Sequence, residues 1–134
     1  MESNQVKPKV LTEEERQKKR ALSRKLMGSL QRHVLVCNGH CCSNRGAGEE
    51  VLQAFKQVVD EYDDQKTVRV TATSCLARCG DACSVVVYPE GTWYQHMKPE
   101  EVEGFVKDYL LTGSVDESHM IYSYQEGRFI EKMK

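Results

Sequence analysis

Hydrophobic and polar positions follow two different periods from residue 33 onward. The nearly continuous apolar run His33–Cys37 predicts a buried strand, and Val68, Val70 and Ala72 alternate as on a strand with one covered face. Between these strands, apolar residues recur at helical spacing; they are Val51, Phe55, Val58, Val59 and Tyr62. The order strand, helix, strand predicts a right-handed crossover and a parallel strand pair.

The second half of the chain shows a hairpin followed by a helix. Ser84–Tyr88 and Thr92–Tyr94 predict two strands joined at the turn Pro89–Gly91. A helix is expected from Pro99, closed near Gly113. Its apolar face consists of Val102, Phe105, Val106, Tyr109 and Leu110. These elements together predict an α/β fold, a thioredoxin-like βαβ-ββα sandwich.

The N-terminal part is more polar. Thr12 and Glu15 form a capping box that predicts a helix over about 12–30. Its apolar stripe is thin, so we expect a solvated helix docked along one narrow edge; the stripe consists of Leu22, Leu26 and Leu30. The expected organisation is a basic N-terminal tail and helix over 1–32, the thioredoxin-like domain over 33–115 and a C-terminal extension over 116–134. In that extension, Met120–Tyr124 is expected to form a strand or an extended arm.

Charge is distributed unevenly along the chain. Residues 1–32 hold nine Lys and Arg against four Glu, whereas residues 33–134 hold ten against sixteen Asp and Glu. The net charges are therefore +5 for residues 1–32 and −6 for residues 33–134. This difference indicates either a basic leader on an acidic domain or two oppositely charged surfaces that dock on each other or contact a partner. The net charge of −1 gives no reason to expect nucleic acid or membrane as a partner. With no apolar signal segment at the start, a cytoplasmic protein is expected.

Six cysteines fall into two tight groups, each where a predicted strand ends; they are Cys37, Cys41 and Cys42, then Cys75, Cys79 and Cys83. In a reducing compartment such groups favour a metal site over disulfides. Four converging thiolates suit a [2Fe–2S] cluster, and they also suit zinc. Zinc sites prefer two-residue spacings, which neither pair has. A dithiol catalyst would need C-x-x-C at the start of a helix, which is also missing.

The spacings C-x4-C and C-x3-C, together with several longer segments, resemble the thioredoxin-like [2Fe–2S] ferredoxins and the related small subunit of NADH dehydrogenases and hydrogenases. The matching segments are His33–Cys37, Cys42–Gly46, Val51–Phe55, Cys75–Cys79, Val85–Gly91 and Trp93–Tyr94 with Lys98–Val102. By position, the resemblance implies that the ligands are Cys37, Cys42, Cys75 and Cys79. Cys42 is preferred to Cys41 because Arg45-Gly46 follows it at the spacing of the family.

The resemblance also implies a function: a one-electron carrier without catalytic activity, often a homodimer, that exchanges electrons with a reductase and an acceptor. A cluster-bearing subunit of an NADH-linked complex and a zinc-stabilised interaction module remain alternatives. The chain departs from the family at Ala82-Cys83, where Gly-Pro is usual. This departure adds a thiol near the expected cluster, as Cys41 does. Trp93 and Tyr94 offer more aromatic surface than so small a sheet can bury, which favours a dimer.

Overall fold

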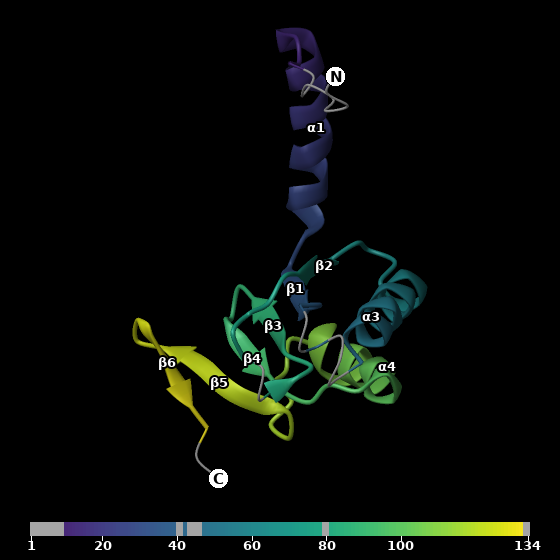
Figure 1. Ribbon diagram of the computed structural model, residues 1–134. Coiled ribbons are helices and arrows are strands. Elements are labelled where there is room, and N and C mark those ends of the chain that lie inside the picture. Colours follow the sequence, from purple (N-terminus) through teal and green to yellow (C-terminus); the bar gives the residue numbers. More distant parts are fainter. Residues whose placement is uncertain (1–9, 40–41, 43–46, 79–80, 133–134) are drawn as a thin grey trace, which may run out of the picture.

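One six-stranded sheet organises the protein (Figure 1). The computed structural model describes residues 10–39, 42, 47–78 and 81–132. The strand order is β2-β1-β3-β4-β5-β6, with β1 parallel to β2 and antiparallel to β3. The strands are β1 (Arg32–Cys37), β2 (Val68–Thr73), β3 (Val85–Tyr88), β4 (Thr92–Tyr94), β5 (Met120–Gln125) and β6 (Arg128–Glu131). The parallel pair and the following hairpin confirm the expected βαβ-ββ order.

The helical layer covers one face of this sheet (Figure 1). It contains α3 (Gly48–Tyr62) and a second segment of three short helices in succession: η2 (Pro99–Glu101), α4 (Val102–Phe105) and η3 (Val106–Leu110). Alternate residues of β1 and β3 face these helices and are fully or almost fully buried; they are Val34, Val36, Val85 and Val87. Phe105 joins the two layers, with its ring 5.9 Å from that of Phe55 and 4.9 Å from that of Tyr94.

A row of paired residues crosses the opposite face of the sheet. The register aligns Leu35 with Val86, Val86 with Trp93, and Trp93 with Tyr122. The Phe129 ring packs edge-on against Trp93 at 6.2 Å. Tyr94, by contrast, is buried in the core of its own chain, so it offers no surface to a partner. The aromatic argument for a dimer therefore applies to Trp93 and not to Tyr94.

The N-terminal helix α1 (Glu13–Ser29) forms where the sequence predicts it. Both halves of the capping box are present: the Glu15 N–H donates to Oγ1 of Thr12, and the Thr12 N–H donates to Oε1 of Glu15. The expected docking along an edge is wrong, because α1 has no buried residue and projects away from the sheet (Figure 1). Its apolar stripe is too narrow to hold it against its own domain.

The C-terminal extension continues the sheet. β5 pairs with β4, and β6 pairs with β5 through a tight turn at Glu126 and Gly127, both with positive φ. The strand expected at Met120–Tyr124 is therefore confirmed as β5, and β6, which the sequence did not predict, completes a hairpin with it. Of the helices that the structure describes, none is long and apolar enough to cross a membrane.

The segment before β5 is held to the helical layer by His119. Its Nδ1 lies 2.6 Å from Oδ2 of Asp116, and its Nε2 lies 3.1 Å from Oε1 of Glu101. Burial by itself lowers the pKa of His119, but the hydrogen bonds and charges of the two carboxylates outweigh it, so the pKa is raised above 6.5. The imidazolium form therefore joins these two segments most strongly.

We expect His119→Gln to lower the free energy of unfolding most at acidic pH. Because the folded pKa of His119 lies above 6.5, its stabilising contribution is fully present below pH 6.5 and is lost as the pH rises through the folded value. Hydrogen bonds to charged groups contribute about 1.5–3 kcal/mol. Urea unfolding of both proteins on either side of pH 6.5 should show a difference that shrinks as the pH rises.

His33→Gln is a matched control with the opposite sign. Burial, and then the charge of Arg69, lower the pKa of His33, so the folded protein favours the neutral ring. Replacing His33 should therefore cost less stability at acidic pH than at neutral pH. A pH-independent difference between wild type and His119→Gln would contradict the role assigned to His119.

Candidate metal centre

The two cysteine loops leave the sheet at the same end. In the parallel pair, Cys37 at the end of β1 aligns with Thr73 at the end of β2. The Asn38 N–H donates to the carbonyl of Thr73 at 2.9 Å, and the Cys37 N–H donates to the carbonyl of Ser84 at 3.0 Å. Because these bonds fix both loop starts, the loops meet at one edge, as the sequence predicts.

Three buried thiols gather at this edge: Cys37, Cys42 and Cys83. The thiol of Cys42 interacts with those of Cys37 and Cys83, and the Cys83 Sγ lies 3.5 Å from the carbonyl oxygen of Cys37. Burial raises the pKa of Cys42 to about 11, and burial with the neighbouring thiols raises that of Cys83 to about 12. Thiolates in this group therefore require a compensating cation.

The backbone of Cys75 lies close to Gly39, in the loop that follows β1. A Cβ added to Gly39 would lie 2.7 Å from both the Cα and the N of Cys75, so only glycine fits between the loops as they stand. Unlike the three buried thiols, Cys75 is exposed. The candidate site therefore has one side formed by buried thiols and another side, at Cys75, that faces solvent.

Backbone and side-chain groups around Cys75 shape the second loop. Ala77 has a φ of +61°, and its N–H donates to the Sγ of Cys75 at 3.2 Å. The amide of a small residue therefore lies against the sulfur of Cys75. Arg78 donates to Asp81 at 2.8 Å, and its guanidinium lies 4.9 Å from the centre of the Tyr122 ring. Arg78 therefore links this loop to the C-terminal hairpin.

Part of the predicted ligand set lies outside the described residues. Cys37, Cys42 and Cys75 are described, whereas Cys41 and Cys79 are not. Among the described residues, no three His, Cys, Asp or Glu side chains are arranged to hold a metal ion by themselves. The assignment of Cys37, Cys42, Cys75 and Cys79 therefore stays a prediction. Its chemistry fits a thiolate-bound cluster, since the described members are free thiols on two adjoining loops.

The sequence did not determine the role of Cys83. Its burial agrees with a packing role, but its contacts with Cys37 and Cys42 place it within the thiol group. The available signal was its position just before the third predicted strand, at the same sheet edge as the other cysteines.

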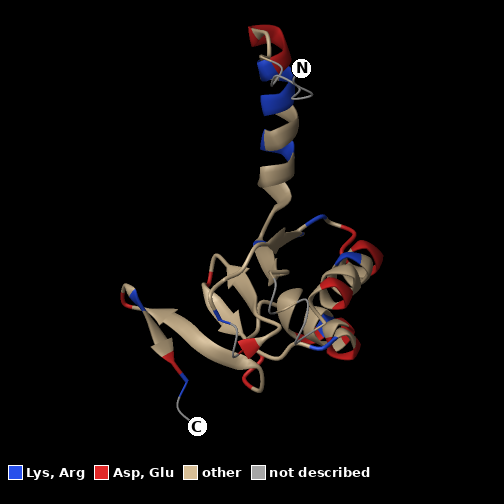
Figure 2. Ribbon diagram, in the orientation of Figure 1, with Lys and Arg blue, Asp and Glu red and all other residues tan. Residues whose placement is uncertain are grey.

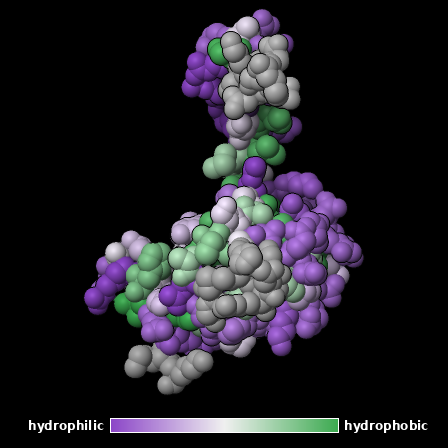
Figure 3. Space-filling view, viewed as in Figure 1, coloured by the Kyte–Doolittle hydropathy of each residue, from purple (hydrophilic) through white to green (hydrophobic). Residues whose placement is uncertain are grey.

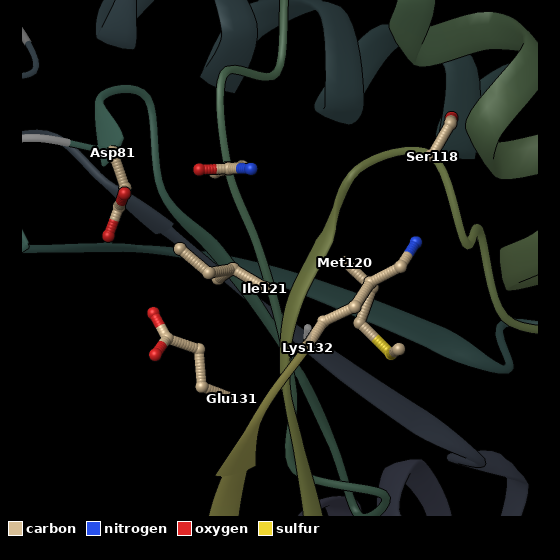
Figure 4. Close-up of a pocket in the computed structure, with 7 residues that line it drawn as sticks. Asp81, Ser118, Met120, Ile121, Glu131 and Lys132 are labelled. Atoms are coloured by element: carbon tan, nitrogen blue, oxygen red, sulfur yellow. The ribbon is translucent and has the colours of Figure 1, made fainter. Parts of the chain in front are cut away.

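An open cavity of about 450 Å³ lies near this edge (Figure 4). The carboxylates of Asp81 and Glu131 point into the same part of it, while Lys132 lies beside Met120 (Figure 4). Arg78 already neutralises Asp81, and Lys132 pairs with Glu117 at 3.7 Å. Asp81 and Lys132 are therefore engaged within the chain.

The fold and the cysteine loops define a class of protein, and comparison with known proteins agrees. The family profile of thioredoxin-like [2Fe–2S] ferredoxins matches residues 21–110, and the chain belongs to this family. It is 35% identical to a putative 2Fe–2S ferredoxin of Priestia megaterium over 78% of this chain and 80% of that one. It is 32% identical to a 2Fe–2S ferredoxin of Clostridium pasteurianum over 62% of this chain and 88% of that one.

A solved structure of similar fold is the thioredoxin-like [2Fe–2S] ferredoxin of Aquifex aeolicus. The two chains superpose with a TM-score of 0.65 at 34% sequence identity, over 72% of this chain and 96% of that one. The thioredoxin-like fold predicted from the sequence is therefore confirmed.

Proposed function

We propose that this protein is a one-electron carrier with a [2Fe–2S] cluster held by Cys37, Cys42, Cys75 and Cys79. The observation that supports it most is the close approach of the two cysteine loops at Gly39 and Cys75 in a member of a ferredoxin family. A thiolate-bound [2Fe–2S] cluster supplies reversible one-electron chemistry.

The residues around the proposed cluster have different roles. The buried Cys37 and Cys42 keep water from one side of the centre, while the exposed Cys75 leaves the other side open to a partner protein. The N–H of Ala77 donates to the Cys75 sulfur, and amide donors of this kind tune the reduction potential. Four cysteine ligands leave no position for water or substrate, so we infer that the protein is not an enzyme.

The partners follow from this role. A carrier needs a reductase that supplies electrons and an acceptor that takes them, and we place this exchange in the cytoplasm. The ferredoxins of Priestia and Clostridium share most of their length with this chain, which favours a freestanding carrier over a subunit of an NADH-linked complex. We also propose a homodimer.

Reductive titration followed by electron paramagnetic resonance tests the carrier. We expect one S = ½ signal that grows to one electron per cluster at a negative potential, because an all-cysteine set stabilises the oxidised cluster. A colourless protein with stoichiometric zinc would overturn the proposal in favour of an interaction module. A positive potential would instead indicate a ligand other than cysteine.

A further inference from the structure

Cys83 is the least exposed of the cysteines that the structure describes. It is 1% exposed, against 2% for Cys42 and 3% for Cys37. Backbone hydrogen bonds fix it on both sides: the Cys37 N–H donates to the carbonyl of Ser84 at 3.0 Å, and the Met97 N–H donates to the carbonyl of Cys83 at 3.3 Å. The side chain of Cys83 is therefore held among the buried thiols, at the sheet edge where the two cysteine loops meet (the cysteine edge).

The sulfur of Cys83 lies against hydrogen-bond acceptors. It is 3.5 Å from the carbonyl oxygen of Cys37 and 4.0 Å from that of Ser84. A thiolate in this place would be repelled by both oxygens, and a buried charge without a partner is unfavourable. Cys83 therefore keeps its proton as a neutral S–H group, which can donate one hydrogen bond.

The sulfur of Cys42 is a stronger acceptor for this S–H group than either carbonyl. Cys42 is in hydrogen-bond contact with the thiol of Cys83 and with the backbone N–H of Ser84. As a ligand of a cluster, Cys42 is a thiolate. A hydrogen bond to an ionised acceptor is about twice as strong as one between neutral groups. The S–H of Cys83 therefore turns toward Cys42 in preference to the neutral carbonyl of Cys37.

Charged side chains act more weakly at the cysteine edge than a buried donor does. The basic side chains of α1 project from the opposite end of β1 (Figure 2). Arg78, beside the second cysteine loop, pairs with Asp81 at 2.8 Å. The outer surface of the helical layer is mainly hydrophilic (Figure 3), so solvent screens the charges there. A buried hydrogen bond lies in a medium of lower dielectric constant and is electrostatically stronger for that reason.

We propose that the thiol of Cys83 donates a hydrogen bond to the thiolate of Cys42 and so raises the reduction potential of the cluster, a role that rests on the proposed carrier function. The added electron increases the negative charge on the cluster and its sulfur ligands. A donor to one of these sulfurs stabilises the reduced state more than the oxidised state. Cys83 is thus a positioning residue, because it acts through Cys42 and does not bind the metal.

Redox titration of the full, cluster-loaded chain tests this hydrogen bond. Cys83→Val and Cys83→Ala both remove the donor, and because valine is larger and alanine smaller than cysteine, a shift that they share does not come from volume. We expect both potentials to be more negative than that of the wild type, by about tenfold in the equilibrium constant for reduction, or about 59 mV for one electron. Cys83→Ser is the matched control, since it keeps a donor and should shift the potential by less than half as much.

Electron–nuclear double resonance of the reduced proteins in H2O and in D2O detects the proton itself. The wild type and Cys83→Ser should each show one more exchangeable proton coupled to the cluster than Cys83→Val does. Wild-type potentials in both donor-free variants, or an equal shift in Cys83→Ser, would overturn the hydrogen bond while the carrier function stands. Loss of the cluster from a folded Cys83→Ala would also overturn it, because Cys83 would then be a ligand. A wild type without an iron–sulfur cluster would overturn the proposed function and this role together.

Discussion

Serine in place of Cys42 should lower the iron and acid-labile sulfide content several-fold, whereas serine in place of Cys41 should leave both near wild type. Cys42 is buried in the thiol group with Cys37 and Cys83, and its replacement removes one of the four proposed thiolate ligands. Iron and sulfide analysis, with visible circular dichroism, measures the effect in freshly purified protein. If the two single variants gave the opposite results, the assignment of Cys42 would be wrong.

Cys83 provides the control that this experiment needs. Its thiol contacts Cys42, so it is placed to replace a missing ligand in Cys42→Ser. Cys83→Ser alone should retain the cluster because the four assigned ligands remain. The double variant of Cys42 and Cys83 should therefore show the full loss, and any cluster that Cys42→Ser keeps but the double variant loses is attributable to Cys83.

Gly39→Ala should strongly weaken cluster retention although it removes no sulfur ligand. The added methyl would lie 2.7 Å from two backbone atoms of Cys75, and backbone cannot rotate away as a side chain can. The two cysteine loops must then separate. Overpacking of this kind costs about 1–3 kcal/mol, which corresponds to roughly 5- to 150-fold in an equilibrium constant.

The rate of cluster loss in the presence of an iron chelator measures this effect. Gly104→Ala is the matched control, because nothing lies within 4 Å of its added Cβ and alanine favours a helix more than glycine does. We expect faster loss for Gly39→Ala and a wild-type rate for Gly104→Ala. Equal rates for the two variants would show that the approach of Gly39 to Cys75 is unimportant for the site.

Two features were beyond prediction from sequence because their signals are weak or depend on distant partners. β6 has four exposed residues and so shows no alternation; only the turn at Glu126-Gly127 between aromatic segments hinted at the hairpin. The second feature is the set of partners of Arg78. Its contacts with Asp81 and Tyr122 arise because the hairpin folds back onto the cysteine loop.

The sequence by itself determined the positions of the main elements, the βαβ-ββ order and the two cysteine groups at strand ends. These are local properties: the period of apolar residues, the capping box at Thr12 and the turn at Pro89–Gly91 depend on neighbours in the chain. Tertiary structure alone decided that Cys83 joins Cys37 and Cys42, that Gly39 adjoins Cys75 and that the described part of the chain buries no residue of α1. Such contacts join segments tens of residues apart, and they are set by how the parallel register and the packing of the helical layer bring those segments together.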